Sequence, residues 1–187
     1  MLKKISFQEP IKLDLGCGKF KKKGFYGIDK FPGESVDKVV DVDKGIPFKD
    51  NSVIEIYSSH VLEHVNNFEF VMEEIYRICK PDAKIIIKVP HFSGKSGFFE
   101  FHKRFFRYDS FSEFEQREKD MDFSKKKIRF KIVKRKLGFL KRWYLFFNYL
   151  FEPIINLSSK FCIFYELTFL RNLFPAHEVI FELRVIK

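Results

Sequence analysis

The sequence has few cysteines and no apolar stretch long enough to cross a bilayer. Its three cysteines, Cys17, Cys79 and Cys162, are widely spaced and form no CxxC pair, which argues against a disulfide framework and a cysteine zinc site. Polar residues interrupt the apolar runs well short of the roughly 20 residues that a spanning helix needs. The first ten residues lack the apolar core of a signal peptide. We therefore expect a cytoplasmic protein.

Aromatic residues, by contrast, are plentiful. The 187 residues include 26 phenylalanines, and 45% of the chain is hydrophobic, which provides enough apolar surface to offset the entropy lost on ordering. The length favours a single domain over residues 1–187. A formal net charge of +10 favours anionic partners such as nucleic acid, phosphorylated metabolites or a lipid surface. Solvated lysines with no partner would give the same excess of charge.

Short apolar runs alternate with helical segments in the first half of the chain. Asn67 is placed to cap a helix that ends before Lys80-Pro81, and its apolar positions recur at helical spacing. The run Ile85–Ile87 is typical of a strand covered on both faces. This alternation predicts an α/β fold with a doubly wound, mostly parallel, Rossmann-like sheet. The expected strands are residues 11–15, 25–29, 38–42, 53–58 and 83–89.

The alternation of strand-like and helix-like segments stops after Pro90. An aromatic stretch follows, and Ser110 with Glu113 forms a capping-box pattern that predicts a helix start. Residues 127–133 and 178–186 alternate well enough to be the last two strands of a seven-stranded sheet. Residues 140–174 between them are strongly aromatic and too long for a hairpin loop. They predict a helical insertion before the last strand.

A glycine-rich turn follows the first expected strand. Asp14-Leu15-Gly16-Cys17-Gly18 lies where open α/β sheets bind ligands, beyond the carboxyl ends of the strands. Glycines there permit positive φ and a close approach of the backbone to a ligand. Asp14 could accept a hydrogen bond from a ligand ammonium group. The plain alternative is an ordinary strand-to-helix turn.

Two carboxylates follow the next strands. Asp29 ends the second strand and is placed to bind the hydroxyls of a ribose, and Asp41, or Asp43, follows the third and could accept the amine of an adenine. A dinucleotide fingerprint is absent, because Lys21 stands where the third glycine of GxGxxG would fall. Only residues 16–24 separate the first two strands, so we expect the first helix to be short or degenerate.

Four segments together resemble a class I S-adenosylmethionine-dependent methyltransferase over residues 11–90: LDLGCG, GID, VDVDKGIPFKDNSVIEIYSSHVLEHV and EEIYRICKPDAKIIIKVP. The resemblance implies S-adenosylmethionine as cofactor, with residues 1–90 as the cofactor-binding half and residues 91–187 on the substrate side. The glycine turn would hold the aminocarboxypropyl group. The residues implied at the cofactor are Asp14, Gly16, Cys17, Gly18, Asp29, Asp41, Ser59 and His60.

Methyl transfer is an in-line displacement, so the protein must align the reactants, exclude water and deprotonate a hydroxyl acceptor. His91 and His102 are the candidate bases. The stretch around them and the closing FPAHEVIFELRVIK also resemble small methyltransferases of glycan pathways. We therefore expect an O or N atom of a small-molecule or glycan-linked acceptor. Residues 140–174 would act as core and lid packing, or contact the inner membrane face.

Three other functions fit parts of the sequence. Basic residues between 125 and 136 would suit an RNA methyltransferase, although the tetrapeptide typical of base-amine methylation is replaced by Ser58-Ser59-His60-Val61. The run His60–His64 matches the HxxEH zinc-hydrolase motif, but no third carboxylate ligand is apparent, so we expect no metal. A non-catalytic cofactor-binding protein is the third alternative.

Overall fold

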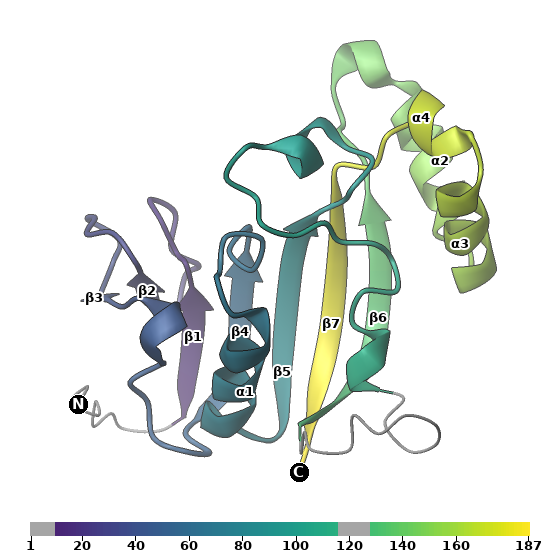
Figure 1. The fold of residues 1–187 in the computed structure, drawn as a ribbon. Helices are drawn as coiled ribbons and strands as arrows, with labels where there is room; N and C mark the ends of the chain where they lie inside the picture. The colour runs from purple at the N-terminus through teal and green to yellow at the C-terminus, as the bar shows by residue number, and fades with distance from the viewer. Residues whose placement is uncertain (1–9, 116–127) are drawn as a thin grey trace.

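The computed structural model describes residues 10–115 and 128–187. They form a seven-stranded sheet with the order β3-β2-β1-β4-β5-β7-β6 (Figure 1). Neighbouring strands from β3 to β5 are parallel, and β7 runs antiparallel to both β5 and β6. The predicted mostly parallel, Rossmann-like sheet is confirmed. Its strands are β1 (Ile11–Leu15), β2 (Tyr26–Asp29), β3 (Lys38–Val39), β4 (Val53–Ser59), β5 (Cys79–Pro90), β6 (Arg129–Gly138) and β7 (Glu178–Ile186).

Helix α1 (Phe68–Ile78) connects β4 to β5, whereas α2 (Phe147–Ile155), α3 (Ser159–Leu167) and α4 (Leu170–Leu173) all lie between β6 and β7. The predicted helical insertion is therefore confirmed, and Figure 1 shows it beyond one end of the sheet. Within the described ranges, no helix is long and apolar enough to cross a membrane. Short 3-10 turns complete the structure at Val42–Lys44 (η1), Lys95–Phe98 (η2), Ser112–Phe114 (η3) and Trp143–Leu145 (η4).

Helix α1 begins where the sequence predicts. The Asn67 side chain accepts a hydrogen bond from the Phe70 amide at 3.1 Å, which satisfies one of the free donors of the first turn. The side chains of Val71, Met72, Ile75 and Ile78 are fully buried. The helix gives way directly to β5, so Pro81 lies inside that strand rather than at the helix end. Strand β5 is consequently longer than the predicted 83–89.

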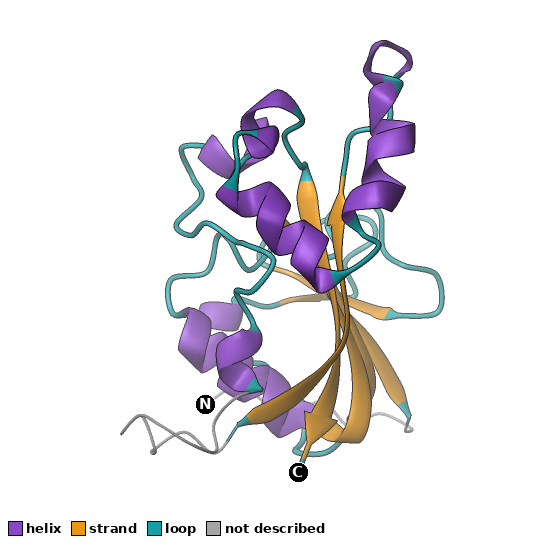
Figure 2. Ribbon diagram, turned by 90° about the vertical axis from the view of Figure 1, so that its right-hand side faces the viewer, coloured by secondary structure: helices purple, strands orange, loops and turns teal. Residues whose placement is uncertain are grey.

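The sheet is covered differently on its two faces. Ile85 and Ile87 are fully buried, whereas Ile86 between them is only half-buried on the opposite face. The prediction of a strand covered on both faces is wrong, because the pattern is that of a sheet with one packed face and one polar face. Figure 2 shows α1 on one side of the sheet and the insertion beyond its end. The polar face carries cross-strand ion pairs, among them Lys84–Glu182 at 3.3 Å and Lys12–Glu55 at 3.0 Å.

The connection from β1 to β2 contains turns and no helix, as its length predicts. Backbone amides of Gly16 and Cys17 both donate to the Ile28 carbonyl, at 2.8 and 3.1 Å, so the turn is fastened to β2. Farther along, Lys21 pairs with Asp37 at 2.7 Å. These contacts hold the loop without the packing of a helix.

The predicted capping box at Ser110 does not form. The Ser110 hydroxyl accepts a hydrogen bond from the Arg107 amide at 2.7 Å, and only the single turn η3 follows, with Phe111 at its start. The helix prediction is wrong for the described residues up to 115. Its apolar positions do pack inward, since Phe111 and Phe114 are buried. The rest of that segment, residues 116–127, lies outside the described residues.

Candidate functional site

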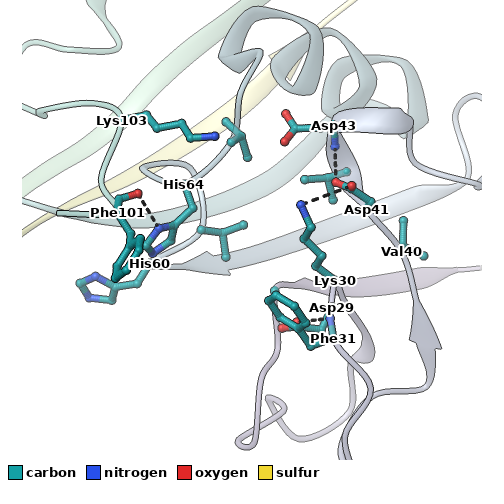
Figure 3. Close-up of a pocket in the computed structure, with 14 residues that line it drawn as sticks. Asp29, Lys30, Phe31, Val40, Asp41, Asp43, His60, His64, Phe101 and Lys103 are labelled. Carbon is teal, nitrogen blue, oxygen red and sulfur yellow. Dashed lines mark hydrogen bonds and ion pairs between the residues drawn. The ribbon is translucent and has the colours of Figure 1, made fainter. Parts of the chain in front are cut away.

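A cavity of about 530 Å³ lies beyond the carboxyl ends of β1, β2 and β4. This edge of the sheet is where the glycine turn and the acidic residues were expected to meet. The cavity wall combines carboxylates, two lysines, two histidines and apolar side chains (Figure 3). The lining consists of Gly16, Asp29, Lys30, Phe31, Val40, Asp41, Val42, Asp43, His60, Val61, His64, Val65, Phe101 and Lys103.

The glycine turn needs both of its glycines, for different reasons. Gly16 has φ +70°, and a Cβ there would lie 2.1 Å from Cγ2 of Val61. Gly18 has φ +52° but has open space where a Cβ would be placed. Positive φ favours glycine at both positions, while the close approach of Val61 excludes a side chain only at Gly16.

Asp29 joins this turn to the cavity. Its carboxylate accepts hydrogen bonds from the Gly18 amide at 2.9 Å and from the Phe31 amide at 3.0 Å. A carboxylate has about four acceptor positions, so two hydrogen bonds leave capacity for a ligand. The residue predicted to bind a ribose therefore lies in the cavity wall and is held rigidly by two backbone amides.

Asp41 and Asp43 lie on the same side of the cavity. Asp41 caps η1 by accepting from the Asp43 amide at 3.2 Å, and the Lys30 ammonium lies 3.4 Å from its carboxylate. Asp43 accepts from the amides of Asn66 and Asn67, at 2.8 and 3.1 Å. Asp43 therefore fastens the loop before α1, whereas the Asp41 carboxylate is paired with the exposed lysines Lys30 and Lys44.

Four of the residues predicted at the cofactor, Asp14, Cys17, Gly18 and Ser59, lie outside the cavity lining. The Asp14 carboxylate is buried and accepts from the Lys22 amide at 2.7 Å, and burial raises its pKa. Burial likewise raises the pKa of the Cys17 thiol to about 11. Ser59, at the end of β4, is paired in register with Lys88. A cofactor role for each of these four residues stays a prediction, as it does for the four that line the cavity.

His60 lies at the other end of the cavity in a constrained position. Its φ of +57° is uncommon for a residue with a side chain,. Its ring contacts Glu178 at 3.5 Å and Glu63 at 3.2 Å. Interactions with Glu178 and then Glu63 raise the pKa of His60 to about 9, so the imidazole is charged at neutral pH. Glu178, at the start of β7, gave no sign in the sequence of belonging to this site.

The HxxEH run does not form the arrangement that zinc hydrolases need. Residues 60–64 form a turn rather than a helix, so its two histidines do not share one helical face. The side chains of Glu63, His64 and His102 nevertheless place one ligand atom each within 4.8 Å of one another. Glu63 is fully buried, and its Oε1 lies 3.2 Å from His60 Nδ1 and 4.0 Å from His102 Nε2. Two imidazoles and a carboxylate are a donor set that binds zinc.

The two candidate bases have different surroundings. The rings of His102 and His64 lie 4.7 Å apart, and the chain neighbours of His102, Phe101 and Lys103, line the cavity. His91 is fully buried and is not part of the lining. Neither histidine is itself a lining residue, but His102 lies between two residues that line the cavity, whereas His91 does not.

Comparison with known proteins agrees with this geometry. Residues 26–87 match the family model of a methyltransferase domain. No curated protein matches the sequence. Among solved structures, the chain is similar to a complex between the Haloferax volcanii Trm112 methyltransferase activator and a methyltransferase, with a TM-score of 0.53, 14% identity and coverage of 94% of this chain and 81% of that one.

Two further solved structures share the fold. An S-adenosylmethionine-dependent methyltransferase from Thermotoga maritima has a TM-score of 0.50 and 16% identity, covering 97% of this chain and 84% of that one. The [4+2]-cyclase SpnF has a TM-score of 0.55 and 14% identity, covering 94% and 74%. Since one fold hosts different reactions, these likenesses show the architecture alone. The match of residues 26–87 to a methyltransferase domain, within this fold, supports an enzyme of the S-adenosylmethionine-dependent methyltransferase type, for which S-adenosylmethionine is the implied cofactor.

Proposed function

We propose that this enzyme transfers the methyl group of S-adenosylmethionine to an O or N atom of a small-molecule or glycan-linked acceptor. The observation that carries the proposal is the Asp29 carboxylate, held in the cavity wall by the Gly18 amide at 2.9 Å. Asp29 would bind the ribose and Asp41 the adenine amine, while the turn at Gly16 lets the backbone approach the aminocarboxypropyl group. When bound, the cofactor supplies an electrophilic methyl group on a sulfonium.

The opposite end of the cavity suits an acceptor. Phe101 and Lys103 line it, and an aromatic ring with an ammonium group fits a sugar that carries a carboxylate or phosphate. His102 lies beside them and faces the buried carboxylate of Glu63, with 4.0 Å between His102 Nε2 and Glu63 Oε1. His102 would take the proton of a hydroxyl acceptor as the oxygen–methyl bond forms. Glu63 stabilises the resulting imidazolium.

The roles of the two ends can be separated by experiment. His102→Gln should lower the rate of methyl transfer by about 100-fold, the usual contribution of a general base, and leave cofactor affinity unchanged. Release of labelled methyl product from a panel of nucleotide sugars, lipid-linked sugar phosphates and transfer RNA gives the rate, and calorimetry gives the affinity. An unchanged rate in His102→Gln would remove the base from the proposal, whereas transfer only to transfer RNA would replace the acceptor.

An RNA acceptor has less support from the described residues. Of the basic residues that suggested it, residues 125–127 lie outside the described ranges. Arg135 is paired with Glu115 and Lys136 with Glu152, so these two charges are already engaged within the protein. The Trm112 partner belongs to the Haloferax protein. We propose that the present chain is a single domain over residues 1–187 and works in the cytoplasm, in peripheral contact with the inner membrane face.

A further inference from the structure

The helical insertion carries a concentration of exposed apolar side chains. Among the described residues, 22 large hydrophobic side chains are exposed, and 14 of them belong to residues 140–173. Trp143 is 87% exposed, Leu157 71% and Leu167 79%. Single exposed apolar residues are normal on a protein surface, but a gathering of this size marks an interaction site.

The insertion helices have separate inner and outer faces. On α3, Cys162 and Tyr165 are buried against the rest of the protein. The exposed residues Lys160, Phe164 and Leu167 recur at i, i+4 and i+7 and so lie on one outer face,. On α2 the exposed positions Phe147, Leu150 and Ile154 recur with the same period. The outer face is therefore continuous along each helix, and we refer to these six positions as the insertion face.

Charge on the insertion is arranged asymmetrically. Its only acidic residues, Glu152 and Glu166, are both buried. Glu152 is held by Lys136 at 2.6 Å, and Glu166 by His91 at 2.8 Å. The basic residues Lys141, Arg142 and Lys160 remain exposed. The outer surface of residues 140–174 is thus apolar and basic, with no exposed acid.

A hollow on α3 combines both properties. It has a volume of about 380 Å³ and is lined by Ser158, Lys160, Phe161 and Phe164. Phenylalanine rings suit the acyl chain of a lipid, and a lysine at the rim suits its anionic headgroup. The net charge of +10 adds a long-range attraction to an anionic surface,.

The insertion also lies at the edge of the sheet where the cavity opens. Strand β6 ends and β7 begins beside the carboxyl end of β5, and Glu178 at the start of β7 contacts His60 of the cavity. Figure 1 shows the insertion beyond this same end of the sheet. A surface bound to the insertion would lie beside the acceptor end of the site.

From these observations we infer that the insertion face binds the surface of an anionic lipid bilayer. The apolar side chains enter the boundary between headgroups and acyl chains, and Arg142 and Lys160 contact anionic headgroups. The biological role of this docking rests on the proposed function, because docking would bring the site to an acceptor held at the membrane. The docking itself depends only on the insertion.

Sedimentation with vesicles tests the docking. The full chain should sediment with vesicles of phosphatidylcholine mixed with phosphatidylglycerol, and weakly with phosphatidylcholine alone. Leu150→Ser combined with Leu167→Ser should lower the partition coefficient at least about tenfold, and Lys160→Ala about fivefold. Val133→Ser is the matched control, because Val133 is 51% exposed on β6 outside the insertion; it should bind as the unaltered protein does.

Two results would overturn the inference. One is a protein that stays in the supernatant with anionic vesicles, and the other is undiminished sedimentation of the double variant. Light scattering without vesicles identifies the main competing occupant, because a dimer that the double variant loses would show that the face binds a second copy of the chain. Calorimetry with S-adenosylmethionine on the same samples keeps the two proposals apart: cofactor binding without vesicle binding refutes the docking alone, and the reverse refutes the proposed function alone.

Discussion

Nε2 of His91 lies 2.8 Å from Oε1 of Glu166, and this contact joins the residue after β5 to helix α3. The carboxylate also accepts from the Tyr108 amide at 2.6 Å. On its other side, His91 Nδ1 lies 2.8 Å from the Ser93 hydroxyl. Both ring nitrogens of His91 are thus engaged in buried contacts that fasten the insertion to the sheet. The position fits a structural role better than the catalytic one that the sequence suggested.

His91→Ala should therefore destabilise the fold. It leaves the buried Glu166 carboxylate without its imidazole partner, which costs about 2–4 kcal/mol. Urea unfolding measures this loss, and the cofactor affinity of the folded fraction should be unchanged. His102→Ala is the control, and we expect it to alter the rate of methyl transfer more than the stability. A His91→Ala protein that is fully stable but inactive would restore the catalytic interpretation.

Substitution at the two turn glycines should have unequal effects. Gly18→Ala introduces only the strain of positive φ, about 1–2 kcal/mol. Gly16→Ala adds a clash with Val61, which raises the cost by about a further 1–3 kcal/mol. Thermal unfolding of the two variants measures the difference, and adding Val61→Ala to Gly16→Ala should recover the part due to the clash. Equal stabilities of the two single variants would show that Val61 does not restrict Gly16.

Lowering the pH should destabilise the loop between η1 and β4, because the Glu74 carboxylate holds this loop through the Ile46 amide. Burial opposes ionisation of this carboxyl, but hydrogen bonds from Arg77 and the Ile46 amide outweigh it and lower its pKa. The stabilisation is complete above the unfolded pKa of about 4.3 and is lost as pH falls through the lower folded pKa. Glu74→Gln should flatten this acid dependence in pH-resolved unfolding experiments. A variant with the same acid slope as the unaltered protein would contradict the assignment.

Removal of metal should leave cofactor binding intact. Asp29 and Asp41, the residues expected to hold the cofactor, do not belong to the donor set of Glu63, His64 and His102, although His64 lines the same cavity. Dialysis against a chelator followed by calorimetry with S-adenosylmethionine measures this, with metal content determined on the same sample. Stoichiometric zinc whose removal abolishes methyl transfer would instead make that cluster part of the reaction.

Several elements of the fold could be predicted because their signals are local. The strand at 11–15 and the last strand at 178–186 have the predicted bounds, and Asn67 caps α1 as expected. Strand alternation and capping depend on neighbouring residues, so the sequence displays them directly. The loop that replaces the first helix was likewise visible in the short spacing between β1 and β2.

The remaining features depend on contacts between distant segments. Glu178 reaches His60 only because β7 inserts beside β5, and His91 reaches Glu166 only because α3 folds back onto the sheet. The run Ile85–Ile87 suggested a strand buried on both faces. Which faces of the sheet are buried depends on the helices that pack on it, and these come from other parts of the chain. Aromatic content located the insertion, whereas its division into an inner and an outer face needed the folded structure.

The central claim is that Asp29 and the glycine turn form a site for S-adenosylmethionine, and calorimetric titration tests it most directly. The unaltered protein should bind S-adenosylmethionine and S-adenosylhomocysteine saturably and should not bind NAD. Asp29→Ala should weaken both affinities by about 10- to 100-fold, in line with the loss of charge-assisted hydrogen bonds. Absence of binding to either sulfur ligand, or equal affinity in Asp29→Ala, would contradict the account.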